Sequence, residues 1–146
     1  MPASGGPPHG GSTAVVLVAV SAGGAVGSLA RHGVASAVPW EGGGFPWATF
    51  LVNVTGAMLL GALVVLTLEV ARAQHLRPFL GVGVLGGYTT FSALALETRT
   101  LLADGAAALA VGYAAATVLL GALAVVAGML AARAAVRHRP AAGGDR

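Results

Sequence analysis

The chain has 146 residues, of which 56% are hydrophobic and only 9% are charged, and its mean hydropathy is +0.83. A soluble globular domain carries about 25% charged residues, so the composition excludes such a domain and indicates one integral membrane domain. The formal charge of +3 comes from scattered arginines rather than a dense basic run, which argues against a nucleic-acid partner. The absence of cysteine excludes disulfides and thiolate chemistry.

The first element expected is a membrane span over residues 13–37. Residues 1–12 form a Pro/Gly-rich leader without Lys or Arg, so they lack the basic region of a signal peptide and we predict disorder there. Gly23, Gly24 and Gly27 place small residues on one face of the span, which favours close helix packing. Arg31 near its end either snorkels to the interface or orders a buried polar network and draws anions to a vestibule.

A glycine-rich turn over residues 39–46 leads to a second span, residues 47–70. Thr49 and Asn53 are four residues apart in this span and therefore share one helical face. A buried Asn in a membrane helix needs hydrogen-bond partners. Asn53 either joins two helices or offers its two amide donors to an anion.

The third span, residues 79–102, differs from a plain membrane anchor. Its centre, residues 83–92, holds three glycines followed by two threonines, Phe91 and a serine. Glycine costs about 1 kcal/mol relative to alanine inside a helix, so we predict that this helix is broken near its middle. Backbone groups freed inside a membrane must find a partner in protein, ion or water, which makes the break a candidate ion or substrate site. Beyond it, Leu94 and Glu97 continue the face of Phe91.

The fourth span is expected over residues 106–132. Tyr113, Thr117 and Gly121 follow one another at steps of four, so the first two form a polar stripe on an otherwise Ala/Leu/Val helix. Tyr113 is alternatively an interfacial belt residue. Residues 133–146 form a polar tail that contains arginine.

Four spans place both termini on one side of the membrane. The arginines near the spans favour the terminal side, with Arg72, Arg77, Arg133, Arg137 and Arg139 there against Arg99, with or without Arg31, on the other. The positive-inside rule therefore predicts cytoplasmic termini.

The polar inventory bears on chemistry. The sequence shows no carboxylate pair, no Ser/His/Asp set and no Cys/His cluster, so we do not expect an enzyme. The polar groups at membrane depth are mostly neutral donors, namely Thr49, Asn53, Thr89, Thr90, Ser92, Tyr113 and Thr117. Donors without fixed negative charge suit an anion, whose hydration shell must be replaced by hydrogen bonds. A broken helix, by contrast, exposes carbonyls that suit a small cation.

Residues 15–132 resemble the CrcB/Fluc family of small bacterial fluoride channels. The resemblance is carried by Gly23-Gly24-Ala25-Val26-Gly27-Ser28-Leu29-Ala30-Arg31, by Thr49-Phe50-Leu51-Val52-Asn53-Val54-Thr55-Gly56, by Gly83-Val84-Leu85-Gly86-Gly87-Tyr88-Thr89-Thr90-Phe91-Ser92, and by Tyr113 with Thr117. The Gly-Gly-x-Thr-Thr-Phe-Ser core is the most specific part.

The resemblance implies an antiparallel, dual-topology homodimer in the bacterial inner membrane, with two narrow pores that export cytoplasmic fluoride passively. It also implies a structural Na⁺ ion at the dimer centre, held by the backbone carbonyls of Gly86 and Thr89. By the same resemblance Arg31 is the vestibule arginine. The fluoride path is lined or flanked by Asn53, Phe91, Ser92, Thr49, Tyr113, Thr117, Leu94 and Glu97.

Two positions depart from the family pattern. Leu94 stands where the family usually has a second pore phenylalanine, and Gly121 lacks a frequent hydroxyl of the polar stripe. One hypothesis is that a related second subunit forms a heterodimer with this chain and supplies the missing ring. The arginine bias agrees with this hypothesis, because a single fixed orientation would then suffice.

Two other function classes remain open from the sequence. A proton-coupled exporter of the small-multidrug type also fits four spans, but it requires an intramembrane carboxylate, for which Glu97 is the only candidate. A non-transporting assembly protein would use the glycines for helix packing alone, and it would leave Asn53, Phe91 and Thr117 without a purpose.

Overall fold

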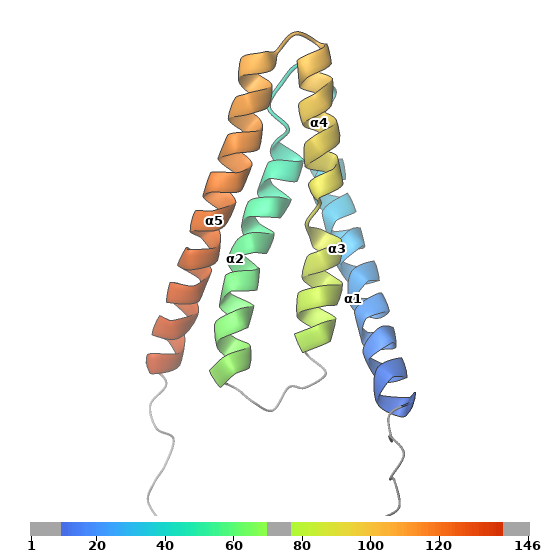
Figure 1. Ribbon diagram of the computed structural model, residues 1–146, viewed down its shortest axis with the longest axis vertical. Coiled ribbons are helices and arrows are strands. Elements are labelled where there is room, and N and C mark those ends of the chain that lie inside the picture. Colours follow the sequence, from blue (N-terminus) through green and yellow to red (C-terminus); the bar gives the residue numbers. More distant parts are fainter. Residues whose placement is uncertain (1–9, 70–76, 139–146) are drawn as a thin grey trace, which may run out of the picture.

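The computed structural model describes residues 10–69 and 77–138, and these residues contain helices and no strand (Figure 1). The elements are α1 (Gly10–Ala37), α2 (Trp47–Glu69), the π-helical η1 (Pro78–Leu85), α3 (Gly86–Tyr88), α4 (Phe91–Ala103) and α5 (Ala107–Arg137). Within these ranges four segments are long and apolar enough to cross a membrane, namely Thr13–Ala37, Trp47–Leu68, Pro78–Ala103 and Ala107–Arg137. The predicted all-α fold with four membrane spans is thereby confirmed.

Both outer helices are longer than the spans predicted from the sequence. α1 begins at Gly10, inside the segment expected to be a disordered leader, and α5 continues to Arg137, five residues into the expected polar tail. In α5 the added residues are mainly alanine and arginine, which are strong helix formers, so this helix need not end where the apolar sequence ends. The remaining leader, the link with Arg72 and the tail with Arg139 lie outside the described residues.

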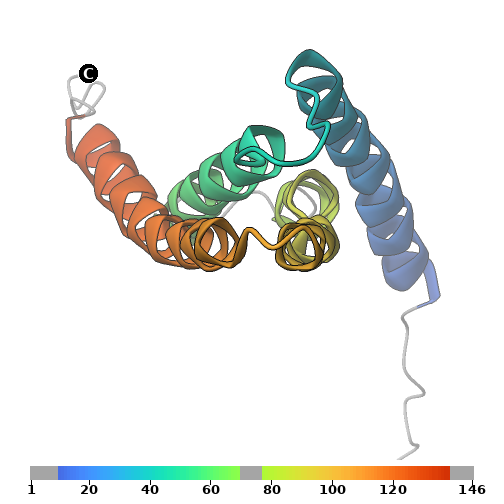
Figure 2. The same cartoon turned by 90° about the horizontal axis from the view of Figure 1, so that it is seen from above.

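The helices form an open row rather than a closed four-helix bundle. Seen from above, α2 lies between α5 and the third span, while α1 lies on the opposite side of that span (Figure 2). The start of α1 and the end of α5 lie at one end of the molecule (Figure 1). The α1–α2 loop and the α4–α5 turn meet at the other end. This open arrangement leaves part of the third span uncovered.

Glycines bring the backbones of α1 and the third span into direct contact. A methyl group added at Gly23 would collide with the carbonyl oxygen of Phe79, and one added at Gly27 would collide with that of Val84. The predicted close helix approach is seen at these two glycines, whereas a methyl group added at Gly24 would meet no heavy atom within 4 Å. Gly61 of α2 and Gly128 of α5 play the same part at the other side of the molecule, where each faces backbone of the opposite helix.

The packed core lies toward the α4–α5 turn. Its buried members are Leu94, Leu101, Ala110 and Tyr113. Aromatic residues of the α1–α2 loop and of α2 pack against it, among them Trp40, Phe45 and Phe50. Many large apolar side chains elsewhere on the helices are exposed in the single chain. In a membrane such side chains face lipid or another protein surface.

Candidate ion path

The third span is interrupted between α3 and α4. Thr89 (φ −81°, ψ 156°) and Thr90 (φ −150°, ψ 116°) have extended backbone, and helical geometry resumes at Phe91. α4 has 13 residues, so at a rise of about 1.5 Å per residue the interruption lies about 20 Å from the α4–α5 turn. This depth is well inside a hydrocarbon layer about 30 Å thick.

The side chain of Asn53, in α2, bonds both backbone polar groups of Thr90. Its Nδ2 donates to the Thr90 carbonyl oxygen at 3.0 Å, and its Oδ1 accepts from the Thr90 N–H at 2.8 Å. The side-chain amide thus pairs with the extended backbone of Thr90 as a neighbouring β-strand would, and it joins α2 to the third span. An Asn amide has two donor hydrogens, so one of them remains for another partner.

The hydroxyl of Thr90 starts α4. It accepts from the backbone N–H of Ala93 at 3.2 Å and lies 3.1 Å from the hydroxyl of Ser92. Threonine is a favoured N-cap because its oxygen satisfies one of the four free N–H groups at a helix start. The interruption is therefore stabilised by side chains, whose hydrogen bonds replace those of the helix.

These replacements release two carbonyl oxygens from the helical pattern. In a continuous α-helix the N–H of Thr90 would bond the carbonyl of Gly86, and the N–H of Ala93 would bond that of Thr89. Both N–H groups donate to side-chain oxygens instead, one of Asn53 and one of Thr90. The carbonyls of Gly86 and Thr89 are thus among those that lose their helical donors at the start of α4, and Gly86 is exposed.

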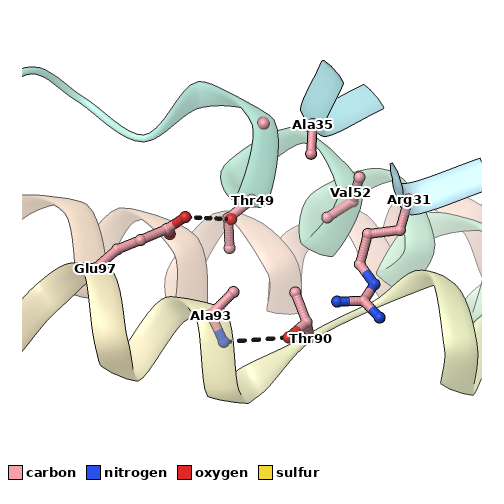
Figure 3. Close-up of a pocket in the computed structure, with 8 residues that line it drawn as sticks. Arg31, Ala35, Thr49, Val52, Thr90, Ala93 and Glu97 are labelled. Atoms are coloured by element: carbon pink, nitrogen blue, oxygen red, sulfur yellow. Dashed lines mark hydrogen bonds between the residues drawn. The ribbon is translucent and has the colours of Figure 1, made fainter. Parts of the chain in front are cut away.

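Arg31 of α1 reaches the same region. Its Nε donates to the carbonyl oxygen of Gly87 at 3.1 Å, so the residue takes part in a polar network with the third span. Its side chain also lines a cavity of about 160 Å³ together with Thr49, Thr90 and Glu97 (Figure 3). The guanidinium lies on the side of this cavity opposite the carboxylate (Figure 3). A cavity with a cation at one side and hydroxyls beside it can admit a small anion.

Glu97 is the centre of a second polar cluster, nearer the α4–α5 turn. Its Oε1 accepts from the hydroxyl of Thr49 at 2.7 Å, and its Oε2 accepts from the hydroxyl of Tyr113 at 2.6 Å. Tyr113 is fully buried, which rules out the alternative of an interfacial belt residue. Thr117, also buried, donates its hydroxyl to the carbonyl oxygen of Tyr113 at 2.8 Å. We call Thr49, Glu97, Tyr113 and Thr117 the polar track.

The face of α4 that carries Phe91 and Leu94 is partly buried and partly exposed. Leu94 is buried at 6% exposure in the core beside Tyr113, whereas Phe91 is 79% exposed and projects away from its own chain. Ser92 is exposed as well. A methyl group added at Gly121 would meet no heavy atom within 4 Å, so the missing hydroxyl there leaves open space.

Two features near the path were not predicted. Tyr88 OH lies 3.1 Å from the hydroxyl of Thr55, and Thr55 itself donates to the carbonyl oxygen of Leu51 at 2.6 Å, so Tyr88 is the donor of the pair. Phe45, in the α1–α2 loop, packs its ring against Tyr113. The first has a weak sequence signal, an aromatic hydroxyl among glycines. The second has none, because a loop residue has no helical period.

The fold and these clusters define a small multi-pass membrane protein whose third span is interrupted beside a hydrogen-bonded polar track. Residues 18–129 match the family model described as CrcB-like protein, Camphor Resistance (CrcB), and the chain belongs to this family. The family resemblance seen in the sequence is confirmed.

Several relatives carry names that state a function. The chain is 52% identical over 98 residues to "Fluoride-specific ion channel FluC 2" of Nocardia farcinica, which is 66% of this chain and 69% of that relative. It is 48% identical over 93 residues to "Fluoride-specific ion channel FluC" of Thermus thermophilus, which is 63% of this chain and 74% of that relative. It is 47% identical over 93 residues to "Fluoride-specific ion channel FluC 1" of Streptomyces coelicolor, at 63% and 60% coverage.

Proposed function

We propose that the chain forms a fluoride-selective channel that carries cytoplasmic fluoride out of the cell passively. The observation that carries the proposal is the match to the CrcB family over residues 18–129, because this range contains Arg31, Asn53, the interruption and the whole polar track. Relatives at about half identity are named fluoride-specific ion channels. The protein then acts as a transporter and not as an enzyme, in a bacterial plasma membrane.

A passive path is sufficient for this task. Fluoride enters cells as neutral HF at low external pH and dissociates inside, so the membrane potential alone drives the anion out. A path for fluoride needs hydrogen-bond donors that replace water. The cavity beside Arg31 and the free amide hydrogen of Asn53 supply donors at one end, and the hydroxyls of the polar track supply them at the other.

The hydrogen bonds of Glu97 set a condition on conduction. Each hydroxyl has a single hydrogen, and those of Thr49 and Tyr113 both point to the carboxylate. For fluoride to bind in the polar track, these hydroxyls must turn from Glu97 to the ion while the ion passes. Glu97 is then a flanking group that holds the donors in place when fluoride is absent. The exporter alternative gains no support from this arrangement, because both carboxylate oxygens already accept hydrogen bonds from the track.

A second subunit completes the exposed face of the third span in this proposal. The Phe91 side chain, 79% exposed, is the large ring that a partner would cover, and it lies next to the interruption. An antiparallel homodimer, as the family resemblance implies, would let Phe91 of each subunit reach a pore formed with the other. The alternative is a heterodimer whose second chain supplies the ring that Leu94 lacks.

The carbonyls of Gly86 and Thr89 fit a structural Na⁺ ion. Their helical donors bond elsewhere, and carbonyl oxygens are the ligands that protein sites present to small alkali cations. Two copies of the chain would offer these oxygens from both sides of an interface. The ion would supply positive charge that balances the carbonyl dipoles and joins the subunits.

The test is anion release from liposomes. The purified chain, expressed alone, is reconstituted into liposomes loaded with potassium fluoride or potassium chloride, and release after addition of valinomycin is followed with ion-selective electrodes. We expect rapid fluoride release and retained chloride. Fluoride release no faster than from empty liposomes would contradict a self-sufficient channel. Recovery on co-reconstitution with a related subunit that releases no fluoride by itself would then establish the heterodimer.

A further inference from the structure

The loop between α1 and α2 has a defined conformation. Gly42 and Gly43 have φ values of 92° and 72°, in the left-handed region that glycine adopts without steric cost. The indole Nε1 of Trp40 donates to the carbonyl oxygen of Gly44 at 2.8 Å, which closes the loop on itself. The loop therefore directs the residues just before α2 rather than merely linking two helices.

The residue that it directs inward is Phe45. Its ring meets that of Tyr113 edge to face, with centroids 5.3 Å apart and planes at 83°. On its other sides it contacts Phe50 at 5.3 Å and Trp47 at 4.6 Å. The next residue, Pro46, is fully buried and starts the backbone hydrogen bonds of α2 by accepting from the N–H of Phe50.

Phe45 thus lies against a ring whose hydroxyl has a defined task. The Tyr113 hydroxyl donates to Glu97 at 2.6 Å, and its ring is fully buried although it is only six residues from the start of α5. Six residues of helix correspond to about 9 Å, a depth that water reaches unless something covers it. The Phe45 ring, which lies directly against that of Tyr113, provides that cover.

We infer that Phe45 is a positioning residue of the polar track, which holds the Tyr113 phenol against Glu97 and closes the track toward the α1–α2 loop. Aromatic pairs in this geometry hold each other's orientation beyond simple burial. Without the Phe45 ring, Tyr113 gains room to rotate, and water gains access to the carboxylate. The hydroxyl would then no longer be held where a passing anion finds it. The consequence for flux rests on the proposed fluoride channel, whereas the consequence for Glu97 does not.

Two measurements on the full chain test the inference. The first is the infrared carboxylate band of Glu97 in protein labelled with ¹³C-glutamate, identified as the band that Glu97→Gln removes. In Phe45→Ala this band is expected to shift toward that of a solvated carboxylate. The second is valinomycin-driven fluoride efflux, which Phe45→Ala is expected to lower five- to tenfold.

The matched control is Trp47→Ala. Trp47 belongs to the same aromatic group and is 54% exposed, and no ring contact joins it to Tyr113 among the described residues. It is expected to leave the Glu97 band in place and efflux within twofold. An unchanged band in Phe45→Ala, or an equal shift in both variants, would overturn the inference.

The inference can still be tested if Phe45→Ala does not fold or if the unmodified chain carries no fluoride. If Phe45→Ala does not fold, Phe45→Leu retains most of the apolar volume without the ring, and it is expected to shift the band in the same direction by less. A band in Phe45→Leu identical to that of the unmodified chain would overturn the role of the ring. If the unmodified chain carries no fluoride, the proposed function fails, and the infrared band alone still decides the role of Phe45.

Discussion

The interruption at Thr89–Thr90 and the polar track around Glu97 both satisfy polar groups inside a membrane span, but they do so differently. At the interruption, side chains bond backbone, since Asn53 pairs with the peptide groups of Thr90. In the track, side chains bond one another, and Glu97 accepts from two hydroxyls. The track is enclosed by its own chain. The interruption leaves its face open, with Phe91 projecting outward.

The two regions therefore differ in whether one chain can satisfy all of their polar groups. Inside a bilayer a freed backbone group must find a partner. The track meets this need within one chain. The interruption has released carbonyls at Gly86 and Thr89 and an exposed ring beside them, so an ion and a second surface would complete it. Variants at the interruption should therefore affect assembly and flux together, and variants of the track should affect flux alone.

The largest effect is expected from Asn53→Leu. The change leaves the N–H and carbonyl of Thr90 without their partners, and each unsatisfied buried group costs about 1–3 kcal/mol. We expect a lower unfolding temperature and fluoride efflux reduced more than tenfold, measured by thermal unfolding in detergent and by electrode. The control is Thr67→Val, because Thr67 bonds only a carbonyl of its own helix. Equal effects in the two variants would show that Asn53 does not contribute to fluoride conduction.

Phe91→Ile is expected to lower efflux about tenfold with little loss of stability in the single chain. The side chain is 79% exposed, so few contacts within the chain are lost, whereas a pore shared with a partner would lose an aromatic edge. Leu96→Ile, an exposed position in the same helix, serves as control. Undiminished efflux in Phe91→Ile would show that the ring lies outside the path.

Tyr113→Phe is expected to lower efflux three- to tenfold. It removes one donor from Glu97 and keeps the ring and its packing, so we expect a loss of stability of about 1 kcal/mol. Tyr88→Phe is the matched control, because it also deletes one phenol hydroxyl, one that bonds Thr55. Efflux that falls in Tyr88→Phe but not in Tyr113→Phe would show that the polar track is misassigned.

The smallest effect is expected from Gly121→Ser. An added side chain meets open space there, and serine recovers part of the about 1 kcal/mol by which glycine is less favourable than alanine inside a helix. We expect unchanged or slightly higher stability and a rise in efflux of no more than about threefold, from the restored hydroxyl. A marked loss of efflux would show that Gly121 faces a constriction instead.

Much of the fold was predictable because membrane spans are long apolar segments of about 20 residues. The unusual glycines and threonines of residues 83–92 located the interruption of the third span. The partners could not be predicted, since Asn53 and Thr90 are 37 residues apart and only packing brings them together. Nor did the sequence separate Phe91 from Leu94, which lie three residues apart on neighbouring parts of one helix surface. Only the positions of α2 and α5 decide that Leu94 is covered.

The end of α5 illustrates a different limit. The span was expected to stop at residue 132 because arginines follow, yet the helix continues to Arg137. Hydrophobicity marks where a membrane ends, whereas helix propensity decides where a helix ends. Phe45 was missed for a related reason. Its role depends on a loop conformation set by two left-handed glycines, and no periodic pattern reports that.

The claim that a second subunit completes the interruption has a direct test, because the chain has no cysteine. Ser92→Cys places a thiol on the exposed face beside Phe91, near mid-membrane, where antiparallel copies would meet at equal depth. Leu130→Cys places one on an exposed position near the far end of α5, where antiparallel copies would lie at opposite membrane faces. With a short bismaleimide in native membranes, we expect a cross-linked dimer for Ser92→Cys and none for Leu130→Cys. Monomer alone for Ser92→Cys, or a dimer formed only through Leu130→Cys, would contradict the claim.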